Sequence, residues 1–374
     1  MLAAPRSITT VNNAGLGPIS GYLVDRFGPR IMATCGIFVM GLGLVMFGLT
    51  HYLWMYFLSN VIIAAGTTFQ GMLVLSVAIN QWFRRKRTMA QSVMMLGFPM
   101  AGLVGIPLLG LVQASLGWQT AAIGSGILIW AVGLPCAQLL RTRPETYGLL
   151  PDGDSPQAIP TGRNRDGNGE PEFDFTLRQA LRTRAFWLLA SAGAIGNVGM
   201  GAVQTHLFLH LERGAAHLSP ATATLVWSVA SFTNMPCRLL AGFLGDRLPK
   251  QVMLGVSMLL MSTSVFILAI ATSAEMAFAF ALIYGVGWGI RTPIINAIQA
   301  DYFGRKSLGK IVGWLQAPAI PTTVAAPILV GYLADLQGNY RMAFMITSLV
   351  SLVGGVLLFL ATAPKRPAAE RSDT

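Results

Sequence analysis

Residues 21–30 read GYLVDRFGPR, a charged motif between two apolar runs near the start of the chain. A shortened copy, GFLGDR, occupies residues 242–247, so Gly21 corresponds to Gly242 and Asp25 to Asp246 at a numbering offset of 221. Further pairs keep this offset to within one position: Phe83 and Pro107 match Phe303 and Pro327, and Gly110 and Gly117 match Gly331 and Gly338. An internal duplication explains such a series better than coincidence.

The composition is typical of a membrane protein. Of the 374 residues, 53% are hydrophobic and 11% are charged, whereas soluble domains carry about 25% charged residues. Apolar runs recur at lengths near the roughly 20 residues that cross a bilayer as a helix. The net charge of +11 is spread over short loops, so nucleic acid is not an expected partner. We therefore predict an all-α polytopic membrane protein in contact with lipid, with no room for a soluble catalytic domain.

Eleven membrane spans are expected, divided by one long polar stretch at 141–183 that has the composition of a flexible linker. The predicted domains are an N-terminal bundle at 1–140, the linker, a C-terminal bundle at 184–362 and a tail at 363–374. The expected spans are 3–24, 31–50, 53–80, 89–113, 118–140, 184–211, 219–244, 251–272, 275–300, 309–333 and 341–362.

The duplication predicts that one helix is missing from the first half. The second half opens with a span near residue 184, and the same position in the first repeat would precede residue 1. We therefore expect eleven helices of a six-plus-six arrangement. A misplaced start site and a real truncation both explain the deficit at this stage.

Lysine and arginine gather in alternate loops. One set of loops, together with the linker and the tail, holds nearly all of them, while the opposite loops hold Arg213 and Arg341. Because short cytoplasmic loops are enriched in these residues, we expect the linker and the C-terminus on the cytoplasmic side of the cell's inner or plasma membrane.

The motif G-x-L-x-D-R-x-G-x-R with its degenerate copy resembles the major facilitator superfamily. WFRRKRTMAQSV (82–93), RPETYGLLPDG (143–153), LRTRAFWLL (181–189) and DYFGRKSLGKIVG (301–313) are similar to its monocarboxylate-porter and oxalate/formate-antiporter branch. The resemblance implies two pseudo-symmetric six-helix bundles and secondary transport by alternating access. The second motif departs from the first, since Pro249 and Gln251 replace Gly28 and Arg30.

The motif residues suit a helix junction. Glycine lets two helices approach closely, aspartate accepts hydrogen bonds at a helix terminus, and the arginines supply charges that can pair across the bundles. The resemblance implies that this loop latches one access state; a topology anchor without a conformational role is the alternative. The predicted conformational residues are Gly21, Asp25, Arg26, Gly28, Arg30, Gly242, Asp246 and Arg247.

Two arginines, Arg238 and Arg291, fall inside expected spans, where each costs about 2.5–3.5 kcal/mol. A guanidinium pairs well with a carboxylate, so an organic anion is the natural ligand. The resemblance implies that Arg238 binds the carboxylate and takes part in coupling, whereas Asn234 replaces an acidic residue implicated in proton coupling. A structural Arg238 paired to backbone carbonyls, and an Arg291 held by cation–π packing on Trp288 and Tyr284, are the alternatives.

Other polar residues share these helical faces. Gln70 matches Arg291 by the offset between the repeats, Asn197 and Gln204 lie on one face of a predicted helix, and His206 and His210 either gate entry or sense pH, or are ordinary interfacial residues. The prolines within 97–107 and 317–327 allow local bending of two related helices. The predicted substrate-binding residues are Arg238, Asn234, Arg291, Gln70, Asn197, Gln204 and Tyr284.

The preferred function is secondary active transport of small organic anions, most simply monocarboxylates, by a monomer with a coupling proton or counter-anion. The alternatives are a truncated non-transporting relic, a receptor-like binder, or a transporter of another class such as drug efflux. Catalytic motifs are missing from the sequence, so no enzyme, cofactor or metal is expected. The cysteines, Cys35, Cys136 and Cys237, are expected to be small core residues.

Overall fold

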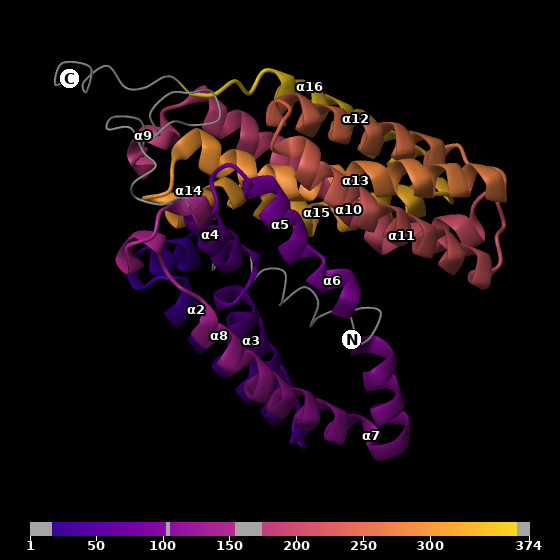
Figure 1. Ribbon diagram of the computed structural model, residues 1–374. Coiled ribbons are helices and arrows are strands. Elements are labelled where there is room, and N and C mark those ends of the chain that lie inside the picture. The colour runs from indigo at the N-terminus through magenta and orange to yellow at the C-terminus, as the bar shows by residue number, and fades with distance from the viewer. Residues whose placement is uncertain (1–16, 102–104, 154–173, 365–374) are drawn as a thin grey trace. The chain divides into compact units, whose positions relative to one another are not determined.

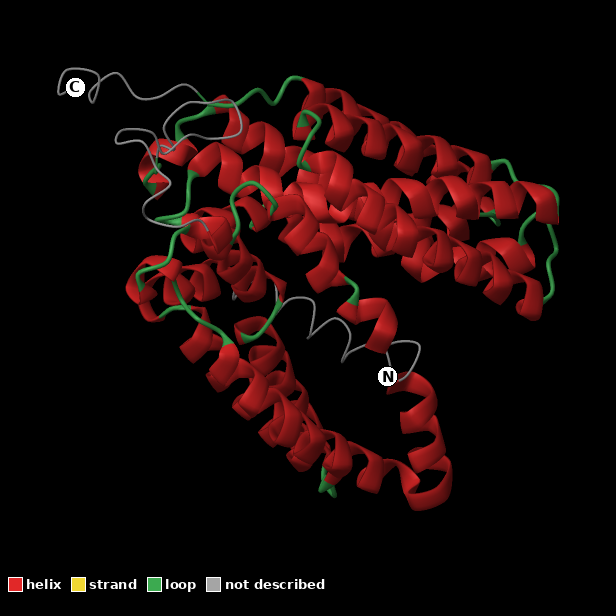
Figure 2. Cartoon of the chain, in the orientation of Figure 1, coloured by secondary structure: helices red, strands yellow, loops and turns green. Residues whose placement is uncertain are grey.

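A computed structural model describes residues 17–101, 105–153 and 174–364. These residues form helices joined by short loops and contain no strand, which confirms the all-α prediction for this part of the chain (Figure 2). Before the linker, residues 17–27 are helical. They are followed by α2 (Pro29–Gly48), α3 (Leu53–Phe69), α4 (Met72–Trp82), α5 (Arg87–Met95), α6 (Gly97–Met100), α7 (Ile106–Leu128), a π-helical turn (Ile129–Gly133) and α8 (Leu134–Leu139).

The second half consists of longer helices. Within the predicted linker lie two 3₁₀ turns (Pro144–Tyr147 and Pro151–Gly153) and α9 (Leu177–Leu181), while residues 154–173 are outside the described part. The helices after the linker are α10 (Arg184–Arg213), α11 (Pro220–Gly245), α12 (Lys250–Ala269), α13 (Ala274–Phe303), α14 (Leu308–Gln316), α15 (Ala319–Gln337) and α16 (Arg341–Phe359).

Eight helical segments of the described chain are long and apolar enough to cross a bilayer. The expected span 219–244 forms α11, which is long enough but is not among the eight, because Thr, Ser, Asn and Arg side chains make it more polar. Most of the expected span 3–24 precedes the described residues. The eight segments are 29–48, 53–82, 111–139, 184–213, 250–269, 274–303, 308–337 and 341–359.

The chain divides into two compact units that do not follow sequence order. The first unit takes residues 1–85, 96–180 and 303–317, and the second takes 86–95, 181–302 and 318–374. Helix α5, from the first repeat, therefore belongs with second-repeat helices, and α14, from the second repeat, belongs with first-repeat helices.

In the first unit, α3, α7 and α8 pack against α2 (Figure 1). Glycines permit the close approach: a Cβ on Gly36 would lie 2.5 Å from the backbone nitrogen of Gln70, and one on Gly66 would overlap the backbone nitrogen of Met40. Such small-residue contacts are how membrane helices gain dispersion energy without a hydrophobic driving force.

In the second unit, α16 packs against α10 and α12, α15 packs against α10, and α5 packs against α11 (Figure 1). Leu207, Val226, Phe280 and Phe344, each 0–1% exposed, lie in its apolar core. This core holds α10, α11 and α13 in fixed positions, and these three helices carry most of the predicted substrate residues.

Backbone conformations support the duplication. Gly117 and Gly338, which the offset between the repeats pairs, both adopt positive φ, at 82° and 68°. Gly28 also has φ 82°, and a Cβ there would lie 2.9 Å from Cγ2 of Thr142, whereas Pro249 has φ −59°. The two motifs therefore lead into α2 and α12 by different backbone paths, which accounts for the departure of the second motif from the first.

The two proline-containing segments coincide with helix breaks. Helix α14 ends at Gln316 and α15 begins at Ala319. In the matching part of the first repeat, α5 ends at Met95 and α6 covers Gly97–Met100. Related helices of both repeats are thus interrupted at similar places.

Candidate functional site

The aspartate of the first motif caps a helix of the other repeat. In the first unit, the Asp25 carboxylate accepts hydrogen bonds from the backbone N–H groups of Gly309 at 2.9 Å and Lys310 at 2.8 Å, at the start of α14. A side chain at Gly21 would overlap the carbonyl of Gly309. Burial raises the pKa of Asp25 above its usual value, although these hydrogen bonds and the nearby Lys310 and Arg143 oppose that shift.

The second motif repeats this arrangement in the second unit. Asp246 accepts from the N–H groups of Thr88 at 2.8 Å and Met89 at 3.2 Å, at the start of α5. Gly242 is also at a close contact, since a Cβ there would lie 2.6 Å from Oγ of Ser92. The capped pairs 88–89 and 309–310 correspond by the same offset as the two motifs, so the contacts follow the duplication seen in the sequence.

The motif arginines contact side chains within their own units. Arg30 donates to Oε1 of Gln138 at 2.6 Å, Arg26 lies 5.4 Å from the ring centroid of Phe27, and Arg247 lies 3.9 Å from that of Phe243. Arg26 and Arg247 thus lie on rings next to their own motifs, while Arg30 ties the start of α2 to α8.

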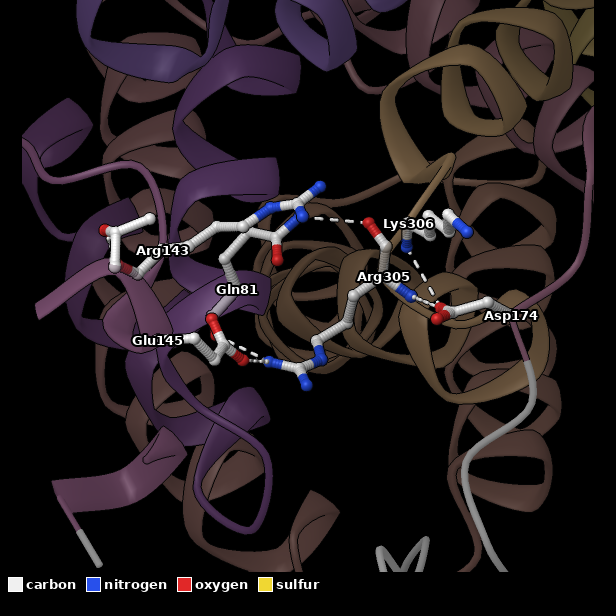
Figure 3. A pocket seen from close by; sticks show the side chains of 7 residues that line it. Gln81, Arg143, Glu145, Asp174, Arg305 and Lys306 are labelled. Carbon is white, nitrogen blue, oxygen red and sulfur yellow. Dashed lines mark hydrogen bonds and ion pairs between the residues drawn. The ribbon is translucent and has the colours of Figure 1, made fainter. Parts of the chain in front are cut away.

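A pocket of about 470 Å³ lies in the first unit, at the ends of the linker (Figure 3). Arg305 donates to the carbonyl of Gln81 at 3.0 Å and to Oε1 of Glu145 at 3.3 Å, and Nε2 of Gln81 donates to the Arg305 carbonyl at 2.9 Å. Sequence reasoning missed this site, although RPETYGLLPDG was the signal for it. The pocket is lined by Gln81, Arg143, Glu145, Thr146, Asp174, Arg305 and Lys306, none of which was a predicted substrate residue.

Sequence reasoning also missed an ion triad in the second unit. Asp301 accepts from Arg87 at 2.5 Å and from Lys250 at 2.6 Å, and the Arg87 side chain is only 3% exposed. The acidic residue at the end of an otherwise apolar span was the available signal. Arg87 and Asp301 come from different repeats, so the triad ties first-repeat to second-repeat sequence.

Arg238 lies buried on α11, with 5% of its surface exposed. One guanidinium nitrogen, Nη1, donates to the carbonyl of Met95 at 2.7 Å, while Nε is buried without a partner among the described residues. Asn234, one helical turn earlier, is 4% exposed, and its Nδ2 is likewise buried and unpartnered. Arg238 thus binds one backbone carbonyl, as the structural alternative expects. Its Nε and the Nδ2 of Asn234 have no acceptor among the described residues.

Tyr284 and Arg291 lie on α13, which packs closely on α11. A Cβ on Gly289 of α13 would lie 2.7 Å from the carbonyl oxygen of Asn234. The Tyr284 side chain is fully buried, its hydroxyl has no partner among the described residues, and it interacts electrostatically with Arg291. Cation–π contacts within the described residues do not include Arg291, whose guanidinium instead lies against Gly196 of α10.

The remaining predicted residues are more scattered. Asn197 on α10 is half-buried and follows Gly196, whereas Gln204 is exposed. Gln70 belongs to the first unit, where it ends α3 and its amide approaches the sulfur of Met40. In the second unit, Arg238 and Asn234 share α11 and Tyr284 and Arg291 share the closely packed α13, whereas Gln204 is exposed.

Both histidines of α10 are buried within the second unit. His206 donates from Nε2 to the carbonyl of Pro327 at 2.9 Å, and His210 donates to that of Leu268 at 2.8 Å. A carbonyl can only accept, so these contacts fix the proton of the neutral imidazole on Nε2. The expectation of core cysteines was wrong for Cys35 and Cys136, which are exposed because their helix faces lack a packed neighbour.

Comparisons with known proteins agree with this architecture. The chain is 26% identical to monocarboxylate transporter 13 of Bos taurus over 92% of this chain and 76% of that protein. It is 24% identical to the oxalate:formate antiporter of Oxalobacter formigenes over 94% and 80%. Its fold matches a crystal structure of the E. coli fucose:proton symporter with a TM-score of 0.71 at 16% identity, covering 96% of this chain and 90% of that one.

The family model described as Major Facilitator Superfamily matches residues 7–289 and 213–374. Together these two matches cover most of the chain, and they overlap as expected for a duplicated sequence. The helical architecture, the paired motifs and this match lead to one conclusion: the chain belongs to the major facilitator superfamily and is a multi-pass membrane transporter.

Proposed function

We propose that the chain is a secondary active transporter of small organic anions, most simply monocarboxylates, that works by alternating access. The observation that carries this proposal is a set of buried hydrogen-bond donors without acceptors. Nε of Arg238, Nδ2 of Asn234 and the hydroxyl of Tyr284 are all buried and unpartnered among the described residues.

These groups have a shared chemical requirement. A buried donor left without an acceptor costs about 1–3 kcal/mol, and more when it is charged. A carboxylate supplies two oxygens and no donor, so it satisfies several such groups and balances a guanidinium charge. We assign the carboxylate to Arg238 and Asn234, with Tyr284 and Arg291 on the neighbouring helix and Asn197 on α10.

The names of the two relatives support the same substrate class. Gln70 and Gln204 are retained as weaker candidates, because one lies in the first unit and the other is exposed. Asn234 has no ionisable proton, so coupling occurs either through another group or by exchange against a counter-anion. A pH gradient imposed on vesicles in uptake measurements distinguishes proton coupling from exchange.

The proposal includes the orientation and domain arrangement. The bundles are 1–140 and 184–362, the linker 141–183 and the tail 363–374 face the cytoplasm, and the protein acts as a monomer in the cell membrane. The distribution of lysine and arginine supports this orientation.

The direct test is uptake of labelled formate, acetate, lactate and oxalate into proteoliposomes. We expect uptake of at least one monocarboxylate and a loss of at least about tenfold in Arg238→Gln, because a charge-assisted hydrogen bond is worth about 1.5–3 kcal/mol. Arg213→Gln is the matched control, since Arg213 is an exposed arginine at the end of α10.

Three other outcomes would change the assignment. Unchanged uptake in Arg238→Gln removes this residue from the site. Transport of lipophilic cations without anion uptake favours drug efflux. Anion binding without any uptake favours a receptor-like binder.

A further inference from the structure

Two acidic linker residues hold two related loops that lead into helices. We call residues 83–86, immediately before α5, the α5 entry loop and residues 304–307, immediately before α14, the α14 entry loop. The two loops correspond by the offset between the repeats, and each contains adjacent basic residues, Arg84 to Lys86 in one and Arg305 and Lys306 in the other. Neither linker residue belongs to the motifs or to the predicted substrate site.

Asp152 binds the α5 entry loop. Its carboxylate accepts from the backbone N–H groups of Arg84 at 3.2 Å and Arg85 at 2.8 Å, and its side chain is only 7% exposed. Asp152 also has φ 62°, a left-handed conformation that residues other than glycine adopt infrequently. The aspartate of RPETYGLLPDG thus occupies a left-handed conformation that suits Asp and Asn better than most residues, and it is buried against backbone donors.

Asp174 binds the α14 entry loop in the same manner. Its Oδ1 accepts from the N–H groups of Arg305 at 2.7 Å and Lys306 at 3.0 Å (Figure 3). The next residue reinforces the attachment, because the N–H of Phe175 donates to the carbonyl of Phe303 at 3.0 Å and the two rings are 6.0 Å apart. Glu145, from the other end of the linker, binds the Arg305 side chain.

The four carboxylates bind backbone N–H groups at corresponding positions of the two repeats. Asp152 holds residues 84 and 85, and the motif residue Asp246 holds residues 88 and 89. Asp174 holds residues 305 and 306, and Asp25 holds residues 309 and 310. At the start of each of α5 and α14, four backbone N–H groups therefore donate to carboxylates. Two of them donate to a linker aspartate, and the next two donate to a motif aspartate.

We infer that Asp152 and Asp174 are positioning residues of the transport cycle, which set the entry of α5 and α14 so that the motif aspartates can cap these helices. Loss of either linker carboxylate frees its loop, weakens the adjacent motif cap and changes the rate at which these helices move. Substrate affinity is retained, because neither residue contacts the proposed substrate site. The uptake arm of the test rests on the proposed function.

The test combines transport kinetics with cysteine labelling. In Asp152→Asn and Asp174→Asn we expect the maximal uptake rate to fall about tenfold, the effect of losing charge-assisted bonds, with KM changed by less than about twofold. Asp335→Asn is the control, since Asp335 is an exposed carboxylate on α15.

Labelling requires no transported substrate. With Cys35, Cys136 and Cys237 replaced by serine, single cysteines at Ser92 of α5 and Val312 of α14, which are 0% and 3% exposed, report opening of these helices. In open membrane fragments treated with a maleimide, Asp152→Asn should accelerate labelling at position 92 and Asp174→Asn at position 312, each severalfold. Asp335→Asn should alter neither rate.

The inference is overturned if both variants match Asp335→Asn in labelling and in maximal rate. A rise in KM without a change in labelling also overturns it, because that result places the residues at the substrate site. If wild type transports none of the four anions, the proposed function fails while labelling still decides the inference. If an asparagine variant does not reach the membrane, Asp152→Ser or Asp174→Ser, which keep an uncharged acceptor, replace it in the same comparison.

Discussion

The guanidinium of Arg87 donates to the carboxylate of Asp301 at 2.5 Å and so joins the two repeats across 214 positions of sequence. Lys250 binds the other oxygen of the same carboxylate. Arg87 is almost fully buried, so the Asp301 carboxylate balances its charge where little water reaches it. This ion triad fixes the start of α5 against the end of α13 and the start of α12 in the second unit.

Asp301→Asn should destabilise the protein by about 3–5 kcal/mol, the cost of removing one partner of a buried ion pair. Thermal unfolding in detergent measures the loss. Arg87→Met combined with Asp301→Leu should be less destabilising than Asp301→Asn alone. Equal destabilisation by the double and single variants would show that the residual charge is not the cause.

Gly289→Ala should weaken substrate binding. The added Cβ would lie 2.7 Å from the carbonyl oxygen of Asn234, and overpacking costs about 1–3 kcal/mol, so α11 and α13 must separate. The shift moves Tyr284 and Arg291 away from Arg238, and KM for the transported anion should rise. Gly193→Ala is the control because a Cβ there meets no atom within 4 Å. A KM unchanged from that of the control would argue against a site shared by these helices.

Gly28→Ala should destabilise the chain by about 1–2 kcal/mol, because an L residue is disfavoured at φ 82° and the new Cβ would meet Thr142. Gly124→Ala, at a helical position with open space around it, should be neutral or slightly stabilising. Unfolding midpoints of the two variants give the comparison. Similar midpoints would show that α2 can begin with a different backbone conformation at position 28.

The stability contribution of Asp25 should depend on pH. Burial raises its pKa above 3.8, so the folded chain binds this proton more tightly than the unfolded chain does. The free energy of unfolding of wild type should therefore fall relative to that of Asp25→Asn as pH rises from 3.8 to the raised pKa. Above that pKa, the difference in free energy between the two proteins should stay constant. Unfolding midpoints of both proteins between about pH 3 and pH 8 test the sign. A difference that grows in favour of wild type with rising pH contradicts it.

The sequence predicted the parts of the fold that depend on hydropathy and repetition. Apolar runs located eight of the eleven expected spans, and the nearly constant offset between the repeats placed Asp25 and Asp246 at equivalent positions. It also predicted that Arg238 and Asn234 share a face, because helical spacing is regular. The assignment of substrate to these residues stays a prediction.

The contacts of the linker could not be predicted in the same way. Every residue except proline has a backbone N–H, so the amino-acid sequence does not indicate that Asp152 binds residues 84 and 85. The composition of 151–172 favoured a flexible segment, yet its first residues form an ordered turn. Hydropathy likewise does not show that α5 and α14 pack with helices of the opposite repeat.

Because α5 and α14 each belong to the unit formed mainly by the other repeat, the two halves of the chain cannot be separated at the linker without loss of packing. A fragment that ends before the linker would contain α5 without the second-unit helices against which it packs. A fragment that starts after the linker would contain α14 without the first-unit helices against which it packs. Each half synthesised alone would thus lack one helix that its own unit needs, and production of both halves in one cell would supply it.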